Sequence, residues 1–400
     1  EENTEMYVRF SVVLRPSVHR FLFRFKSCGI IGLPNVGKST LFNALTRTQA
    51  AEAANYPFCT IEPNSATVSI PDPRLDVLAE ISQTEKKVPS QLSFTDVAGL
   101  VRNAHKGEGL GNQFLANIRE CAVILHVLRC FEDSNIIHVD SHVDPVADME
   151  VVETELLLAD LDVIEKRLAT VGKKMRATNN KDVVDQYNVL EKCQAILGSG
   201  KWLSTEKAWS EEERVTVNNL NLLTTKPMAY ICNTAEEAAG TGNEYTRAVE
   251  AHVKQTKAGE DCQVLVISSI LEEEASTCDN EEEKMELLEL AGLTTTGLQK
   301  VIDTTAVLLR QQVFYTVGKA ETRSWVIPEG ATAAVAAGKI HSDMQKGFIK
   351  ADVMTSADFV ELGGEEAVKE AGKMRQEGKD YIVSDGDIMV FKFKAPPSKN

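Results

Sequence analysis

The chain has 400 residues and a formal net charge of −16 at pH 7, which argues against indiscriminate binding of nucleic acid. Its length and its hydrophobic content of 43% are typical of an ordinary soluble protein with two or three domains. No apolar stretch approaches the ~18 residues of a membrane span. The eight cysteines form no C-x-x-C pair, so neither a zinc site nor a disulfide framework is predicted. The default expectation is a monomer in the reducing cytoplasm, without membrane contact.

A basic segment comes first in the chain. Residues 1–26 carry five basic and three acidic groups, and no acidic residue stands between Met6 and Ser27. This composition is somewhat like that of a mitochondrial transit segment. We favour a basic extension ahead of the first strand, with a mitochondrial location as the alternative.

The most informative motif is Gly32-Leu33-Pro34-Asn35-Val36-Gly37-Lys38-Ser39, which fits the pattern G-x-x-x-x-G-K-[ST]. It follows an apolar strand at residues 28–31 and precedes a helix opening at residues 40–46, which is the context that this motif requires. Its glycines let backbone N–H groups surround phosphate oxygens at a helix N-terminus. The predicted nucleotide-binding residues are Asn35, Val36, Gly37, Lys38, Ser39 and Thr40. Lys38 would contact the β- and γ-phosphates and is also a catalytic candidate, and the Ser39 hydroxyl would ligate Mg²⁺.

Two further positions complete the predicted metal site. Asp96-Val97-Ala98-Gly99 ends the expected strand at residues 92–97 and fits D-x-x-G, in which Asp96 holds Mg²⁺ through water and the Gly99 amide contacts the γ-phosphate. Between the two motifs, Thr60 is a candidate switch threonine whose hydroxyl closes the Mg²⁺ shell, with a surface turn as the alternative. The predicted metal residues are therefore Ser39, Thr60 and Asp96.

The residue that orients the attacking water is not evident. Leu100 follows the D-x-x-G motif, where many small GTPases have Gln, and a leucine side chain cannot orient water. The candidates are His126, inside an expected strand at residues 122–128, and His105 in a nearby loop. Asn35 is a further candidate, as a ligand of K⁺ that offsets developing charge. Slow hydrolysis is the alternative.

After residue 144 the pattern becomes helical. Apolar residues recur at helical spacing through a run rich in charged residues, namely Met149, Val152, Leu156, Ala159, Val163 and Leu168. A break at Thr178–Asn180 leads to a second helical run at Val183–Leu197. We expect a helical hairpin inserted in the α/β domain, with the apolar stripe as its own seam and a partner-binding face as the alternative.

Base recognition should follow the strand at Met228–Cys232. GTPases read guanine there with Asn-Lys-x-Asp, whereas this chain has Asn233-Thr234-Ala235-Glu236. The lysine is absent and the acid is one methylene longer, so guanine selectivity should be lost and ATP accepted at least as well. The predicted base-binding residues are Asn233, Thr234 and Glu236, together with Ser268 and the backbone amides after the strand at Val264–Ser268.

The last third of the chain has a different pattern. An acidic stretch at Glu272–Glu289 is interpreted as a linker, and a helix is expected at Thr296–Leu309. Short strands are then expected around a helix at Glu365–Arg375, which indicates a small mixed α+β module: Trp325–Ile327, Gly347–Val353 and Ile388–Phe393.

Several longer strings together resemble the Obg-like ATPases, the YchF family of translation-factor-related P-loop GTPases. Besides the phosphate loop and Asp96–Val101, they are Asn55–Asn64, Gly107–Asn112, Arg129–Asp133, Ala337–Asp343 and Gly347–Ile349. The resemblance covers nearly the whole chain from Ser27. It implies a P-loop NTPase domain of the Ras-like type (27–145 and 223–309) after the basic extension (1–26). It also implies an inserted helical arm (146–222) and a C-terminal β-grasp TGS domain (310–396).

The same resemblance implies ATP as the preferred nucleotide, slow hydrolysis, and association with the large ribosomal subunit or the whole ribosome. It also supports His126 as catalytic, since the family carries a histidine at this place. RNA or protein contacts would lie on the arm and the TGS domain, where Lys173, Lys174 and Arg176 form the arm's most basic patch or a solvated helix end. The chain is thus expected to be an ATP-hydrolysing switch. The alternatives are a nucleotide-gated binding module with incidental hydrolysis and a conventional GTPase.

Overall fold

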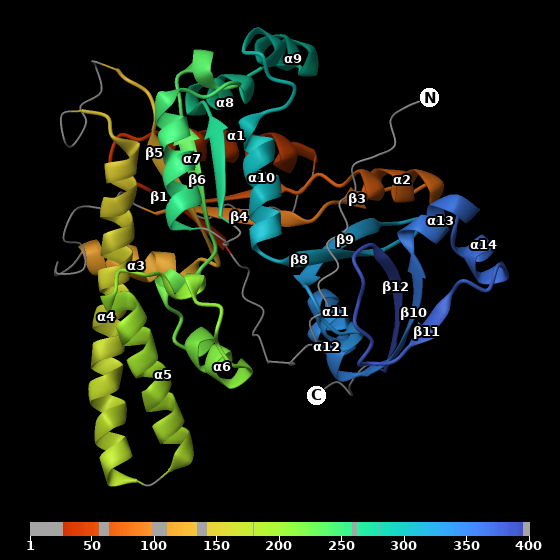
Figure 1. Cartoon of the computed structure of the whole chain (residues 1–400). Helices are drawn as coiled ribbons and strands as arrows, with labels where there is room; N and C mark the ends of the chain where they lie inside the picture. Colours follow the sequence, from red (N-terminus) through yellow and green to blue (C-terminus); the bar gives the residue numbers. More distant parts are fainter. Residues whose placement is uncertain are drawn as a thin grey trace.

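The computed structural model describes residues 27–55, 64–97, 110–133, 142–178, 180–257, 262–278 and 280–394. Within these ranges the strands form two six-stranded sheets, and a long pair of helices projects away from both (Figure 1). Among the described residues, no helix is both long enough and apolar enough to span a membrane.

The first sheet has the order β2-β4-β1-β5-β6-β7, and all its strands are parallel except β2. Its strands are β1 (Ser27–Ile31), β2 (Ser65–Ser69), β4 (Gln91–Asp96), β5 (Val123–Arg129), β6 (Met228–Asn233) and β7 (Gln263–Ile267). Every residue of β5 and β6 is buried, as expected for parallel strands covered on both faces. The carboxyl ends of the parallel strands meet at one edge, where an open α/β sheet binds its ligand.

The first domain contains further helices, some of which pack on this sheet. They are α1 (Lys38–Asn55), α3 (Leu110–Glu120), α7 (Glu244–Thr256), α8 (Ser269–Ala275), α9 (Glu281–Leu290) and α10 (Gly297–Leu308), with the short 3₁₀ turn η4 (Glu236–Ala238). Helix α1 packs on β2 and α8, and α10 packs on β6 and β7. With the insertion described next and a C-terminal β domain, this is the predicted α/β P-loop NTPase architecture.

The inserted arm consists of α4 (Pro145–Ala177) and α5 (Lys181–Gly198). Helix α4 begins where Asp144 accepts a hydrogen bond from the Ala147 amide and Pro145 occupies the first turn, a strong start signal. The chain returns to β6 through η2 (Leu203–Thr205), α6 (Glu211–Asn219) and η3 (Leu223–Thr225).

The expected role of the apolar stripe on α4 is wrong for its first half. Met149, Val152, Leu156 and Ala159 belong to the core of the first sheet, not to the hairpin seam. The seam is built farther along, where Ile164 and Val171 of α4 pack with Val189, Leu190, Cys193 and Leu197 of α5 and its neighbours. A helix of 33 residues is long enough to serve both surfaces, which helical periodicity alone does not separate.

The acidic stretch at Glu272–Glu289 is not a linker, because it forms α8 and α9. Glu272 is 1% exposed and accepts hydrogen bonds from the backbone N–H groups of Gly297 and Leu298, at 2.6 and 3.1 Å. A Cβ on Gly297 would lie 2.7 Å from the Glu272 carboxylate, so this approach requires glycine. Burial raises the pKa of Glu272. An acidic residue thus fixes the start of α10.

The second sheet has the order β11-β10-β12-β8-β9-β3. Its strands are β3 (Lys87–Val88), β8 (Gln311–Thr316), β9 (Thr322–Pro328), β10 (Phe348–Thr355), β11 (Arg375–Glu377) and β12 (Asp387–Phe393). Its helices are α11 (Ala333–Ile340), α12 (Ser342–Lys346), α13 (Ser356–Leu362) and α14 (Glu365–Glu370). The helix expected at Glu365–Arg375 is therefore shorter than predicted: α14 ends at Glu370, and Arg375 already belongs to β11.

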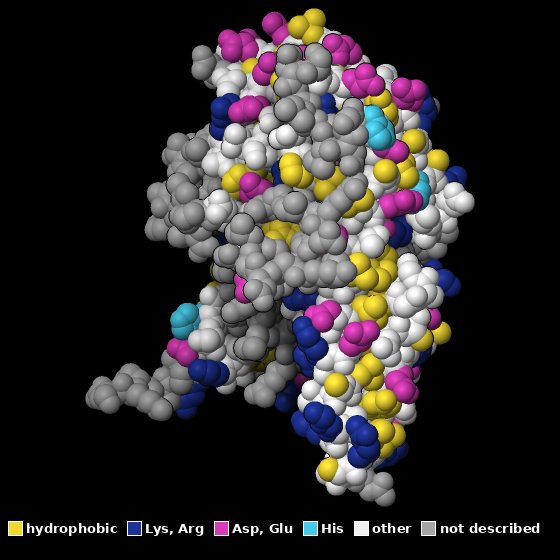
Figure 2. All heavy atoms as spheres, turned by 90° about the vertical axis from the view of Figure 1, so that its left-hand side faces the viewer, with side chains coloured by type: hydrophobic (Ala, Val, Ile, Leu, Met, Phe, Trp, Pro, Cys, Tyr) yellow, Lys and Arg dark blue, Asp and Glu magenta, His cyan; other side chains and the backbone are white. Residues whose placement is uncertain are grey.

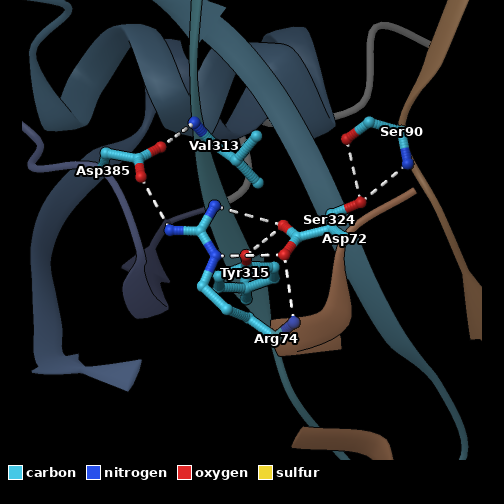
Figure 3. A network of polar contacts seen from close by, with 7 residues as sticks. All are labelled: Asp72, Arg74, Ser90, Val313, Tyr315, Ser324 and Asp385. Atoms are coloured by element: carbon cyan, nitrogen blue, oxygen red, sulfur yellow. Dashed lines mark hydrogen bonds and ion pairs between the residues drawn. The ribbon is translucent and has the colours of Figure 1, made fainter. Parts of the chain in front are cut away.

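The connection between β2 and β4 joins the two sheets. It contains α2 (Pro73–Ile81), whose Leu75 and Leu78 share a core cluster with Tyr315 and Met354, while β3 pairs with β9. Figure 3 shows the polar part of this junction. Arg74 donates to Asp72 and, at 2.7 Å, to Asp385, and Tyr315 also donates to Asp72. Beside them, the Ser90 amide and hydroxyl both contact the Ser324 hydroxyl, at 2.7 and 2.8 Å.

Candidate functional site

The phosphate loop lies between β1 and α1, at the carboxyl edge of the first sheet. Gly32 has φ +150°, and a Cβ there would lie 2.4 Å from the Val127 carbonyl oxygen of the neighbouring strand. Gly37 has φ +97°, and Asn35 adopts the left-handed region with φ 62°. The motif's two glycines therefore occupy backbone positions that a side chain would strain or block.

Lys38 and Asp96 face each other across this loop. Lys38 is 8% exposed, and its ammonium donates a 2.7 Å hydrogen bond to the Leu33 carbonyl, which holds it against the loop. Burial lowers the pKa of Lys38 and raises that of Asp96, and the attraction between the two charges opposes both shifts. Asp96 Oδ1 is buried without a hydrogen-bond partner among the described residues. Ser39, at the next position after Lys38, is exposed.

Asn233 connects the end of β6 to the phosphate loop. Its amide donates 2.9 Å to the Val36 carbonyl, and its oxygen accepts 2.8 Å from the Ser269 amide at the start of α8. The residue is 4% exposed, so both ends of this short side chain are committed to structure that surrounds the site. The predicted residue Val36 thus contributes its carbonyl, while its side chain is buried in the core.

A cavity of about 500 Å³ opens beside these groups. Its lining combines the phosphate loop, the ends of β5 and β6, and the start of α8: Asn35, Gly37, Lys38, Ser39, Thr40, Phe131, Glu132, Asp133, Asn233, Thr234, Ala235, Glu236, Glu237, Ser269 and Ile270. This volume and shape suit one small molecule with a phosphate tail. The structure therefore brings most predicted nucleotide-binding residues to one place.

Ser268 is placed differently. It is fully buried, and its hydroxyl accepts from the Leu271 amide, so it caps α8 and does not line the cavity. The neighbouring residues Ser269 and Ile270 line it instead.

Three of the acidic residues at the cavity were missed as site residues. Glu132 and Asp133 follow β5, and Glu237 follows Glu236 in η4. Phe131 was also missed. The centre of its ring lies 4.8 Å from the Arg129 guanidinium carbon. The signal that could have found Phe131, Glu132 and Asp133 is their position directly after a buried parallel strand, at the same edge as the phosphate loop.

The catalytic prediction for His126 does not agree with its position. His126 lies in the middle of β5, is fully buried, and contacts Tyr230 with ring centroids 5.8 Å apart. Burial and the charges of Lys38 and Lys257 lower its pKa to about 3, and it does not line the cavity. Because its side chain is enclosed within the sheet and does not line the cavity, His126 is placed as a core residue here. Thr60, Gly99, Leu100 and His105 lie outside the described residues.

A larger cleft of about 860 Å³ lies elsewhere, between the return of the arm and the starts of β6 and β7. It contains no residue of the phosphate loop or of Asn233–Glu237, all of which lie at or near the smaller cavity.

Comparison with known proteins agrees with this geometry. Residues 27–159 match the family described as 50S ribosome-binding GTPase, and residues 311–394 match the C-terminal YchF-GTPase family, described as a protein of unknown function (DUF933). The chain is similar to the ribosome-binding ATPase YchF of Escherichia coli O157:H7, with 49% identity over 92% of this chain and 98% of the relative. It is also similar to Obg-like ATPase 1 of Gallus gallus, with 41% identity over 96% of each chain.

A solved structure extends the similarity to the whole fold. The YchF GTPase of Schizosaccharomyces pombe superposes with a TM-score of 0.83 and 34% identity, over 93% of this chain and 99% of that one. The phosphate loop, the altered base-reading segment, the inserted arm and the C-terminal β domain all occur together in this chain. On these grounds the chain belongs to the YchF family of Obg-like ATPases.

Proposed function

We propose that this chain binds and slowly hydrolyses ATP as a molecular switch that acts with the ribosome in the cytoplasm. The observation that carries the proposal is the Asn233 side chain, which joins the phosphate loop to the base end of the same cavity. One molecule that fills this cavity would place phosphates on Gly37–Thr40 and a base against Asn233–Glu237.

The residues present fit Mg²⁺. Asp96 has a buried oxygen with no partner among the described residues, and the exposed Ser39 adds a hydroxyl oxygen. Mg²⁺ prefers such hard oxygen ligands together with phosphate oxygens. Ser39 and Asp96 would hold the ion, with Thr60 as the third proposed ligand, and the ion would neutralise charge on the β- and γ-phosphates.

The chain's own groups bind and orient the nucleotide. The backbone N–H groups around Gly37 bind phosphate oxygens, and Lys38 moves its ammonium from the Leu33 carbonyl to the phosphates. At the base end, Glu236 replaces the shorter acid that reads guanine in GTPases, and Thr234 stands where the lysine would be. Both line the cavity, which supports ATP as the preferred nucleotide.

Slow turnover is part of the proposal. His126 is buried in β5, and Leu100 provides no polar group after the D-x-x-G motif. These facts also favour a second candidate, in which the chain is a nucleotide-gated binding module and hydrolysis is incidental. K⁺ held by Asn35 is the proposed aid to hydrolysis, and equal rates in sodium and potassium buffers would remove it from the account.

The ribosome is proposed as partner because relatives of this chain, such as the YchF protein of Escherichia coli O157:H7, are named ribosome-binding ATPases. Lys173, Lys174 and Arg176 are exposed near the free end of the arm, and Figure 2 shows basic side chains gathered there, while acidic ones gather at the opposite end of the molecule. We propose this end of the arm as a contact for ribosomal RNA. Reversing these three charges should reduce co-sedimentation with ribosomes, whereas reversing Arg247, Lys254 and Lys300 gives the matched control.

The experiment that tests the function is ATP hydrolysis with and without ribosomes. The wild type should hydrolyse ATP slowly alone and several-fold faster with ribosomes, and Lys38→Ala should lose both activities, while Lys254→Ala on the surface of α7 keeps them. No acceleration by ribosomes would favour the binding module. Unchanged ATP affinity in Lys38→Ala would refute the site assignment.

A further inference from the structure

Helix α3 packs on β1, the strand that leads into the phosphate loop. Among the described residues it is the next helix after Asp96, and just beyond its last residue the Ala122 amide donates 2.8 Å to the Ser27 carbonyl at the start of β1. Eleven helical residues cover about 16 Å. Its far end lies at the base of the arm (Figure 1).

Both crossings between arm and sheet converge on that far end, at Arg119. On the outgoing side, the Arg119 guanidinium forms a 3.0 Å ion pair with Asp160 of α4 and donates 3.3 Å to the Ala159 carbonyl. On the return side it donates 3.1 Å to the Asn221 carbonyl, and the Asn221 amide donates 3.1 Å to the Arg119 carbonyl. A single residue of α3 thus contacts both the outgoing and the returning segment of the insertion.

Apart from the partly exposed Arg119 side chain, the cluster is buried, and further hydrogen bonds complete it. Asp160 is 0% exposed, and its second oxygen accepts from the Thr224 amide and hydroxyl at 2.7 and 2.8 Å. Lys226, which is 9% exposed, donates to the carbonyls of Arg119 and Cys121 at 2.9 and 2.5 Å. Losing one partner would leave a buried charge uncompensated, so these groups must move together.

Helix α4 has a second attachment to the first domain, and this one does not involve α3. Glu153 of α4 pairs at 3.1 Å with Lys257, just after α7, and accepts a hydrogen bond from Tyr230 of β6. The Lys257 ammonium lies 4.1 Å from the Trp202 ring centre. Glu153 therefore ties the arm to the domain without touching the helix that follows Asp96.

From this arrangement we infer that Arg119 and Asp160 are positioning residues through which the nucleotide cavity and the arm influence each other. Occupation of the cavity shifts α3, and the cluster passes the shift to the outgoing and returning segments of the arm. The inference rests on the proposed function, because it concerns regulation of the same ATP site. By reciprocity, a partner that binds the arm alters nucleotide affinity through the same two residues.

Hydrogen exchange of the full chain tests the inference without ribosomes. Exchange is compared with Mg²⁺-ADP and with the non-hydrolysable analogue Mg²⁺-adenylyl imidodiphosphate. In the wild type the analogue should change exchange at least threefold at residues 36–40, in α3, and in residues 155–165 and 219–227. Asp160→Asn keeps an oxygen for Thr224 but removes the charge. It should retain the change at 36–40 and lose it at 155–165 and 219–227.

Glu153→Gln is the matched control, since it loosens the same helix without touching α3, and it should keep the wild-type response. Arg119→Gln provides a second disruption at a partly exposed position, and Arg119→Lys should restore part of the response. A wild-type response confined to the loop and α3, or a wild-type response in Asp160→Asn, would overturn the inference. No change at residues 36–40 in the wild type would overturn the proposed function, and the inference with it.

Discussion

The Asn233 side chain lies directly against the Cα of Gly37: a Cβ on Gly37 would be 2.1 Å from the Asn233 amide nitrogen. The approach lets Asn233 reach the Val36 carbonyl, and it makes the glycine of the phosphate loop a packing requirement as well as a conformational one. The loop and the base-reading segment are thus one unit.

Gly37→Ala should therefore disable nucleotide binding. The positive φ and the clash with Asn233 together cost about 1–3 kcal/mol or more, so ATP affinity should fall at least ~10-fold. Isothermal titration measures it. The double variant Gly37→Ala/Asn233→Ala removes the clash but not the strain, so it should bind no better than Asn233→Ala alone. Wild-type affinity in Gly37→Ala would show that the loop relaxes freely.

The junction in Figure 3 should hold the two sheets together as one cooperative unit. Tyr315→Phe removes a buried hydrogen bond to the Asp72 carboxylate, worth about 1.5–3 kcal/mol. We expect a lower thermal midpoint and, in calorimetry, a separate transition for the C-terminal domain. Lys373→Ala, which breaks an exposed ion pair with Asp358 inside that domain, should leave one transition near the wild-type midpoint.

His126 should make the protein sensitive to acid. Its pKa of about 3 in the folded chain lies below the ordinary value of 6.5, so its neutral form is the stable one in the fold. The stability that this neutral form provides is complete above pH 6.5 and is lost as pH falls toward 3. The difference of 3.5 between the two pKa values corresponds to roughly 5 kcal/mol at most.

His126→Leu tests this effect because it keeps the volume and removes the titration. Between pH 6.5 and 4 its free energy of unfolding should fall less than that of the wild type, as measured in urea at each pH. Parallel pH curves for the two proteins would mean that the pKa of His126 is the same in the folded and unfolded chains, which would contradict its burial. An ATPase rate that drops 10²-fold in His126→Leu at pH 7.5, with an unchanged KM, would restore its catalytic role.

The sequence alone was sufficient for the fold class and for the phosphate loop. Gly32–Ser39 is a local motif whose flanking strand and helix can be checked from neighbouring residues, and both appear as β1 and α1. Long-range partners were not accessible in this way. The packing of Met149–Ala159 on the sheet, the cap that Glu272 forms on α10, and the burial of His126 depend on segments far apart in the chain.

The residues of the cavity also divide into those that a local pattern predicts and those that depend on long-range contacts. Asn233 was expected from its place after β6, but its bonds to Val36 and Ser269 join three separate segments and follow only from the fold. Glu132 and Asp133 belong to a string that was noted as typical of the family, and their position directly after β5 indicates the right edge of the sheet, but their approach to the cavity follows only from the fold.

We propose that the altered base-reading segment Asn233–Glu236 makes this P-loop protein an ATP-binding switch. The most direct measurement is a paired titration of ATP and GTP, with Mg²⁺ and identical salt, on the purified wild type and on Lys38→Ala. We expect the wild type to bind ATP clearly more tightly than GTP, and Lys38→Ala to bind neither nucleotide. A clear preference for GTP would contradict this proposal, and would mean that Asn233–Glu236 still reads guanine.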